Sequence, residues 1–297
     1  MFYSQVDYFS LATILHWKLA NRCSRRTFSD LIDEYPNLLA MINILAADIA
    51  EYFYAFLVPF VRISAFTISA PIFTVGAFNI RFRIMVAVML TLLAINVVEF
   101  DAQVLSVDQL ITTLLVQIFL GLIAGFILQI VNGAVTVGGQ AISNSMGLGM
   151  ANMVDPTLGN VPVISQFLLI LSTLIFIIAD GHLLLIQILI QSFETIPIAQ
   201  SLSLEIIYDL FLEWTPLLFL GGLIVALPVI ISVLLVNAGL GMITRSAPAL
   251  NIISVGFPAI MLSGILIVLI ALPGIVQRID LFWRDGFEVF SRFLGGP

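Results

Sequence analysis

The sequence predicts an all-α integral membrane protein with about six long, broken apolar helices, built as one part of a larger assembly. Of the 297 residues, 61% are hydrophobic and only 10% are charged, whereas a soluble domain is about 45–50% apolar and about 25% charged. The mean hydropathy is +1.14. Uncharged stretches such as 109–154 and 246–277 exceed the roughly 20 residues that a membrane-spanning helix needs. Lipid or partner chains must therefore cover much of the apolar surface.

Charged residues divide the chain into six apolar segments. The first is followed by a loop that contains Arg81, and the second by Glu99. The third begins beside Asp108, Asp180 interrupts the fourth, and Arg245 separates the last two. We therefore expect helices near 45–75, 83–99, 107–131, 162–192, 212–240 and 251–275.

Prolines predict breaks in these helices, because proline removes a backbone donor and crowds the preceding turn. Prolines fall inside or at the ends of the apolar segments at Pro59, Pro71, Pro216, Pro228, Pro258 and Pro273. Such breaks are tolerated at membrane depth only where neighbouring protein or a cavity satisfies the freed groups. We therefore expect a subunit of an assembly rather than a simple bundle of straight rods.

Both ends of the chain differ from the apolar region at 41–275. Residues 1–40 have no net charge and are expected to form an N-terminal extension of unknown role. This extension is a surface helix, a flexible arm, or a segment upstream of a true start at Met41. Residues 276–297 form a C-terminal tail that contains three arginines.

The loop charges predict an orientation in the membrane. Arg81 and Arg245 lie in loops that the positive-inside rule places in the cytoplasm. Alternation then places residue 41 and the C-terminus outside, but the arginines of the 276–297 tail favour the inside. The side of the C-terminus therefore stays open.

The stretch 121–160 does not match a helix that packs against lipid. Gly121 and Gly125 form a GxxxG pair, which permits close helix approach. Further on, Gly138 and Gly139 lie among asparagine and glutamine residues. Glycine lowers helix stability and permits close packing, and amides need hydrogen-bond partners that lipid cannot supply. We therefore expect this stretch to be buried in protein or to line a watery space.

Methionines follow at helical spacing within the same stretch. Met146, Met150 and Met153 recur at i, i+4 and i+7, which places them on a common face if the segment is helical. Gap-filling core is the ordinary role of such a row. Because methionine is soft and unbranched, it also suits a deformable seal in a conduit. The glycines beside the row are Gly147 and Gly149, and the turn-forming pair Asp155 and Pro156 ends it.

Several ionisable residues lie within or between the apolar segments. Asp180, Gly181 and His182 stand in the middle of the fourth segment. They form either a proton relay or a break in a helix hairpin, with Gly181 as the hinge. Arg62 lies after Pro59, and pairing with an acidic group of this chain or of a partner would lower its cost, but the sequence does not identify that group. Arg245 lies at a segment end.

No sequence motif indicates an enzyme. The chain has no HExxH, GxSxG or P-loop motif, and it contains two histidines, one cysteine and one lysine. We therefore expect no catalytic residue, no metal ligand and no cofactor. A net charge of −7 argues against nucleic-acid binding, which needs clustered lysine and arginine.

The order of several motifs resembles the FliR family of flagellar export-gate proteins, which is related to injectisome proteins of type III secretion. The stretches that match are PFVRISAFTISAPIF (59–73), NIRFRIMVAVML (79–90), GLIAGFILQIV (121–131), GGQAISNSMGLGMANMVDPT (138–157), FIIADGHLLLIQILIQSFETIP (176–197) and NAGLGMITRSAPALNIISVGFP (237–258). The resemblance covers about residues 41–275. The NIISVGFP ending is more similar to the flagellar branch. Ala249 departs from a glutamine that is common in the family, which puts any contact of that glutamine in doubt.

The resemblance implies a non-enzymatic subunit of tilted helix hairpins within a helical hetero-oligomeric export gate. It implies FliP and FliQ as core partners, FlhB and FlhA as further export components, and unfolded flagellar subunits as substrates. It also implies the bacterial inner membrane, at the flagellar basal body, as the location. The matching loop of the family contributes to the plug of the pore. Carried over, the candidates are Met146, Gly147, Gly149, Met150, Met153, Asp155 and Pro156.

Three alternatives stay open at this point. The first is a proton-coupled secondary transporter that uses Asp180 and His182, although the two halves of the sequence share no detectable repeat. The second is an injectisome export-gate subunit. The third is a purely structural subunit whose glycines only serve packing.

Overall fold

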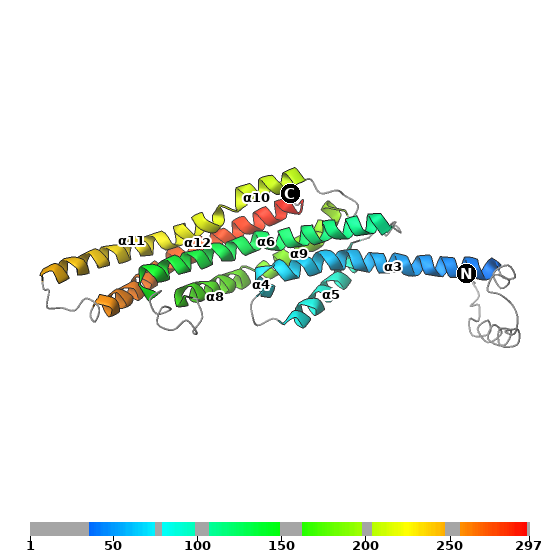
Figure 1. Ribbon diagram of the computed structural model, residues 1–297. Coiled ribbons are helices and arrows are strands. Elements are labelled where there is room, and N and C mark those ends of the chain that lie inside the picture. The colour runs from blue at the N-terminus through cyan, green and yellow to red at the C-terminus, as the bar shows by residue number, and fades with distance from the viewer. Residues whose placement is uncertain are drawn as a thin grey trace, which may run out of the picture. The chain divides into compact units, whose positions relative to one another are not determined.

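The computed structural model describes residues 36–74, 79–98, 107–148, 162–197, 204–246 and 256–295. The helices are α3 (Pro36–Ser69), α4 (Pro71–Thr74), α5 (Ile80–Val97), α6 (Val107–Ser145), α8 (Val163–Ile178), α9 (Gly181–Thr195), α10 (Leu204–Trp214), α11 (Leu217–Ser246) and α12 (Phe257–Phe293) (Figure 1). The chain divides into two compact units, one of Met1–Tyr54 with Ala102–Val104 and one of Ala55–Asp101 with Leu105–Pro297. The contacts below lie within the second unit.

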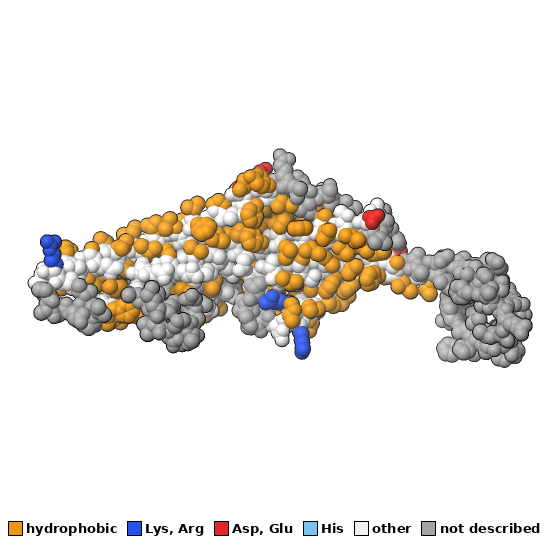
Figure 2. All heavy atoms as spheres, in the orientation of Figure 1, with side chains coloured by type: hydrophobic (Ala, Val, Ile, Leu, Met, Phe, Trp, Pro, Cys, Tyr) orange, Lys and Arg blue, Asp and Glu red, His pale blue; other side chains and the backbone are white. Residues whose placement is uncertain are grey.

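The protein is an all-α integral membrane protein, as the sequence predicts. Among the described residues, five helices are long and apolar enough to cross a membrane, or six if the bent pair α8 and α9 is one span. Hydrophobic side chains cover most of the described surface in the view of Figure 2. Exposed side chains such as Leu235 and Ile270 are 70% and 74% accessible, so the chain presents apolar surface to its surroundings.

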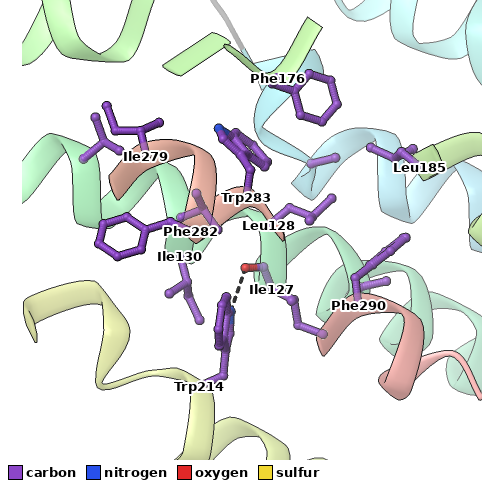
Figure 3. Packing of buried hydrophobic residues seen from close by; sticks show 14 of the residues in the cluster. Ile127, Leu128, Ile130, Phe176, Leu185, Trp214, Ile279, Phe282, Trp283 and Phe290 are labelled. Carbon is purple, nitrogen blue, oxygen red and sulfur yellow. Dashed lines mark hydrogen bonds between the residues drawn. The ribbon is translucent and has the colours of Figure 1, made fainter. Parts of the chain in front are cut away.

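Helix α6 lies at the centre of the second unit and packs against α11, α8 and α12. In an 18-residue apolar stretch of α6, 50% is buried inside the structure. Figure 3 shows Ile127, Leu128 and Ile130 of α6 among aromatic side chains from α10 and α12. Because each packed apolar side chain adds about 1.5–3 kcal/mol in water but less against lipid, close packing carries more of the stability here.

Among the described residues, two buried tryptophans donate hydrogen bonds to α6 and α8. Trp214 donates from Nε1 to the backbone oxygen of Ile127 at 2.9 Å (Figure 3). Trp283 donates from Nε1 to Oγ of Ser172 at 3.0 Å, and Ser172 donates in turn to Oδ1 of Asn132 at 3.3 Å. The amide of Asn132 therefore has a partner inside this chain, and the relay joins α12, α8 and α6.

Two helices are longer than the sequence indicates. The third predicted helix ends near residue 131, but α6 continues to Ser145. Its glycines are held in the helix because neighbouring helices pack directly on them, which overrides their low helix propensity. The last predicted helix ends near residue 275, but α12 continues to Phe293.

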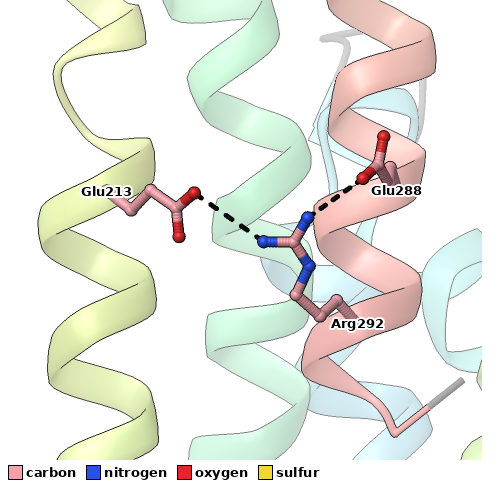
Figure 4. A network of polar contacts seen from close by, with 3 residues as sticks. All are labelled: Glu213, Glu288 and Arg292. Carbon is pink, nitrogen blue, oxygen red and sulfur yellow. Dashed lines mark hydrogen bonds and ion pairs between the residues drawn. The ribbon is translucent and has the colours of Figure 1, made fainter. Parts of the chain in front are cut away.

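The extension of α12 is amphipathic rather than uniformly apolar, which explains why hydropathy alone misses it. Ile275, Ile279 and Phe282 recur at helical spacing and are buried. The exposed side carries charges, and Arg292 lies 2.9 Å from a carboxylate oxygen of Glu288 and 3.7 Å from one of Glu213 (Figure 4). Exposed pairs of this kind add about 0–1 kcal/mol each.

The prolines act differently from one another. Pro59, Pro228 and Pro273 lie inside continuous helices, so the breaks expected there are wrong. Pro71 begins α4, and Pro216 lies at the break between α10 and α11. Proline is tolerated inside a membrane helix where neighbours or local adjustments satisfy the freed carbonyl, so the sequence overstates the breaks. Pro258 occupies the first turn of α12, where no donor is lost.

Candidate functional site

Two glycines of α6 bring α3 into backbone contact. A Cβ atom placed on Gly121 would lie 2.3 Å from the backbone oxygen of Arg62. One placed on Gly125 would lie 2.7 Å from the backbone nitrogen of Ala70. Both distances are far below van der Waals contact, so only glycine fits at either position. The GxxxG pair of the sequence thus lies where α3 and α6 approach most closely.

Directly beside this contact, Arg62 is completely buried. Its Nε donates to Oε1 of Gln117 at 2.5 Å. Its Nη1 donates to the backbone oxygen and to Oγ of Ser192 at 2.9 and 3.1 Å, and its Nη2 donates to the backbone oxygen of Ile196 at 3.0 Å. The guanidinium carbon lies 4.3 Å from the ring centre of Phe193. Arg62 therefore joins α3, α6 and the end of α9.

None of these partners of Arg62 is a carboxylate. Two are backbone oxygens at the C-terminus of α9, where the helix dipole is negative. The oxygen of Ser192 also accepts from the N–H of Ile196, whereas the oxygen of Ile196 lies past the last helical residue. Phe193 adds a cation–π contact. The acidic partner that the sequence left unidentified is thus replaced, among the described residues, by a helix terminus. Arg62 acts here as a distant C-cap of α9.

Glycines also bring α6 against α11 and α8. A Cβ atom on Gly138 would lie 2.9 Å from the backbone oxygen of Gly222 in α11. One on Gly139 would lie 2.4 Å from the Cα atom of Ser165 in α8, and Oγ of Ser165 donates to the backbone oxygen of Thr136 at 3.0 Å. These residues hold three helices together in the middle of the apolar region.

Helix α6 stops at its junction with the predicted plug. Gly147 has φ +75 and its N–H donates to the backbone oxygen of Asn144 at 3.1 Å, a geometry typical of a glycine C-cap. Met146 is fully buried, and a Cβ atom on Gly264 of α12 would lie 2.6 Å from its Cε. The helix α6 therefore ends before Gly147. Gly149, Met150, Met153, Asp155 and Pro156 lie outside the described residues.

The Asp180 region is a bend between two helices. Asp180 has φ 52, the left-handed conformation, and α9 leaves α8 at 67°. Gly181 is buried, and a Cβ atom there would lie 2.5 Å from the ring of Phe176. The side chains of Asp180 and His182 are exposed. This geometry matches the break in a helix hairpin that the sequence offered as one reading of the three residues.

Arg245 lies in the last turn of α11, and its side chain is exposed. A cation at this end of a helix is favourable because it faces the negative end of the helix dipole. The hydrogen-bond partners of Arg62 lie in α6 and at the end of α9, whereas Arg245 lies in α11. The sequence-predicted polar residues therefore occupy separate places rather than one cluster.

Comparison with known proteins decides the family. Residues 53–285 match the sequence profile of bacterial export proteins, family 1. The chain belongs to this family. The flagellar biosynthetic protein FliR of Pectobacterium carotovorum subsp. carotovorum is 33% identical over 255 residues, which cover 86% of this chain and 98% of that protein. FliR of Escherichia coli strain K12 is 32% identical over 238 residues, with coverage of 78% and 90%.

A more distant relative matches over a similar length. FliR of Aquifex aeolicus strain VF5 is 28% identical over 250 residues, which cover 82% of this chain and 95% of that protein. The FliR resemblance inferred from the sequence is therefore confirmed. The match to the bacterial export family includes Arg62, the glycines of α6 and the Asp180 bend. The family assignment indicates a membrane-embedded export component.

Sequence reasoning missed several partners within this export-family fold. Gln117 and Ser192 accept hydrogen bonds from Arg62. Gly222 packs against Gly138, and Gly264 packs against Met146. Gln117 offered a signal, because a single amide in an otherwise apolar stretch needs a polar partner. Gly264 offered none, since a glycine in an apolar helix has many roles and its partner lies far away along the chain.

Proposed function

We propose that this chain is a non-enzymatic subunit of the flagellar protein export gate, located in the bacterial inner membrane. The observation that carries this proposal is the match over nearly the full length of proteins named flagellar biosynthetic protein FliR. In the proposed assembly, FliP and FliQ form the core with this chain. FlhB and FlhA are further partners, and unfolded flagellar subunits pass through the centre.

The proposed plug follows the end of α6. Gly147 ends that helix, and the neighbouring Met146 packs against Gly264 of α12. A segment attached at Gly147 thus starts beside the fully buried Met146, at the end of the helix whose apolar window has the largest buried share among the described candidate spans. In this proposal the segment from Gly147 to Pro156 occludes the pore at rest and is displaced when a substrate chain arrives. Methionine suits such a seal because its side chain adapts to varied surfaces.

The energy for export comes from elsewhere in the proposed apparatus. The sequence has no nucleotide-binding motif, so a proton-motive force or a separate ATPase would drive transport. The rival transporter function requires Asp180 and His182 to exchange a proton inside the membrane. Both side chains are exposed at a helix bend, and no hydrogen bond between them occurs among the described residues. No specific observation favours that rival.

A leak measurement tests the proposed plug. Residues 147–153 are replaced by a glycine–serine linker of equal length that begins with glycine, so that the C-cap of α6 and the buried Met146 are retained. We expect the assembled complex to conduct small ions at rest, because the seal is lost. The readout is ion conductance or dye passage in membranes that contain the complex. A matched control replaces Gly239 with alanine, since no atom lies within 4 Å of a Cβ there. If the linker variant assembles but conducts ions only at the background level, the plug assignment is wrong.

A further inference from the structure

Helix α9 is joined to α8 by a sharp bend rather than by continuous helix. The two helices meet at 67°, and Asp180 between them has the left-handed φ of 52. Aspartate tolerates this conformation at a small cost, so the bend depends on surrounding contacts as well as on the residue itself. Gly181 follows and begins α9. A change of the backbone angles at these two residues alone would therefore swing α9 as one body.

Helix α9 packs into the chain through one narrow side. Leu185, Leu189 and Phe193 recur every four residues and are buried, and we call these three residues the buried row. Leu184 on another side of the helix is 42% exposed. Beyond the bend, α9 packs through side chains, whereas the glycines of α6 bring its backbone against α3, α8 and α11. A helix with fewer buried contacts than its neighbours opens at a lower free-energy cost.

The end of α9 at the bend is seated on aromatic side chains. A Cβ atom on Gly181 would lie 2.5 Å from the ring of Phe176. The ring centre of Phe176 lies 4.7 Å from that of Trp283 in α12 (Figure 3) and 5.8 Å from that of Phe287. These rings fix this end of α9 against α12, so the bend can serve as the pivot of a rotation.

The other end of α9 is fastened by polar groups from two helices. Arg62 of α3 donates from Nη2 to the backbone oxygen of Ile196 at 3.0 Å. Oγ1 of Thr195 donates to the backbone oxygen of Leu294, which directly follows α12. A Cβ atom on Gly295 would lie 3.0 Å from Cβ of Thr195, so the same turn also packs on α9. Both contacts lie where a rotation about the bend would move the helix furthest.

We propose that α9 is a hinged arm that opens about Asp180 and Gly181 while α6, α8 and α11 stay packed. Two fasteners hold the arm closed, one formed by Arg62 and the other by the turn of Leu294 and Gly295. Opening separates the guanidinium from its acceptors on α9 and uncovers the buried row. The arm is a conformational device within this chain, and the inference does not depend on the proposed function.

Cysteine labelling of the full chain in native membranes tests the arm. The one cysteine of the chain is removed by Cys23→Ser, and Leu189→Cys then places a thiol in the buried row. Leu168→Cys is the matched control, because Leu168 is an equally buried leucine of α8, before the bend. Leu184→Cys gives the rate at an exposed position of α9.

We expect N-ethylmaleimide to label position 189 about tenfold faster than position 168, because labelling follows the population of the open form. Both positions should react more slowly than position 184. Equal rates at 189 and 168 would show that α8 and α9 open only together, which would overturn the proposal.

Removal of the hydroxyl group of Thr195 tests the fastener on the α12 side. Thr195→Val keeps the shape of the side chain but loses the hydrogen bond to Leu294. We expect labelling at position 189 to rise about fivefold and labelling at position 168 to stay unchanged, as the loss of one hydrogen bond predicts. Thr173→Val is the matched control, since Thr173 donates within its own helix, and it should change neither rate. No rise at 189, or an equal rise at both positions, would contradict the inference.

Arg62→Lys tests the other fastener with the same labelled positions. One ammonium group cannot reach all the acceptors of the guanidinium, so the hold on α9 weakens. We expect the rate at position 189 to rise about tenfold and to exceed the rise at position 168. If both rates rise equally, or neither changes, Arg62 does not hold the arm and the proposal is wrong.

Discussion

Replacement of Gly121 or Gly139 by valine is expected to destabilise the protein by about 3 kcal/mol or more. The new Cβ would lie 2.3 Å from the backbone oxygen of Arg62 in the first variant and 2.4 Å from Cα of Ser165 in the second. Both opposing atoms belong to backbone and have no rotamer that moves them away. The helices must therefore separate, and lost contacts between α6 and its neighbours add to the cost.

The loss of stability is measured as the fraction of each variant that stays folded after heating in detergent. The amount of each variant in the membrane is measured beside it. Gly239→Val is the control, because nothing lies within 4 Å of a Cβ at that position of α11. Glycine has a low helix propensity, so this control should be neutral or slightly stabilising. Equal stability of Gly139→Val and Gly239→Val would show that α6 and α8 are not in backbone contact.

Removal of the Arg62 guanidinium is the second large effect that we expect. Arg62→Met keeps an unbranched side chain but leaves Oε1 of Gln117 and the backbone oxygen of Ile196 without the Arg62 donor, and it removes one of the two donors of the Ser192 backbone oxygen. Each unsatisfied buried acceptor costs about 1–3 kcal/mol, so we expect a loss of about 3 kcal/mol or more. Arg62→Lys should recover only part of it, because one ammonium group cannot reach partners spread around a planar fork.

A double-mutant cycle with Gln117→Leu separates this contact from general damage. If Arg62 and Gln117 interact as described, the two substitutions together cost less than the sum of the single effects, with a coupling of about 0.5–3 kcal/mol. The thermal midpoint in detergent is the readout for all three variants. Strict additivity would mean that the 2.5 Å contact between Nε and Oε1 does not contribute to stability.

Composition and local sequence pattern predicted the membrane helices, one close approach of two helices and, as one of two readings, the bend at Asp180. The apolar runs predicted membrane helices, because a continuous apolar run of about 20 residues satisfies its backbone groups within one helix in lipid. The GxxxG pair at Gly121 and Gly125 predicted close helix approach, and the structure places α3 there. The Asp180 bend was one of two readings of a charged residue in an apolar run, and the positive φ at that residue shows the bend directly.

Long-range packing decided what the sequence left open. Glycines at 138 and 139 were expected to disfavour a regular helix, but α8 and α11 pack on them and α6 continues to Ser145. Arg62 was expected to need an acidic partner, and the structure provides backbone oxygens 130 and 134 residues away instead. No local pattern encodes a carbonyl group at the end of a distant helix, so only the assembled fold reveals it.

Purification of the full chain from native membranes under mild detergent tests the central claim most directly, when it is followed by mass-spectrometric identification of the bound proteins. The account predicts a stable complex in which this chain is bound to small apolar export proteins such as FliP and FliQ. Recovery of the chain as a stable, folded protein without any partner, from membranes that support flagellar assembly, would contradict it.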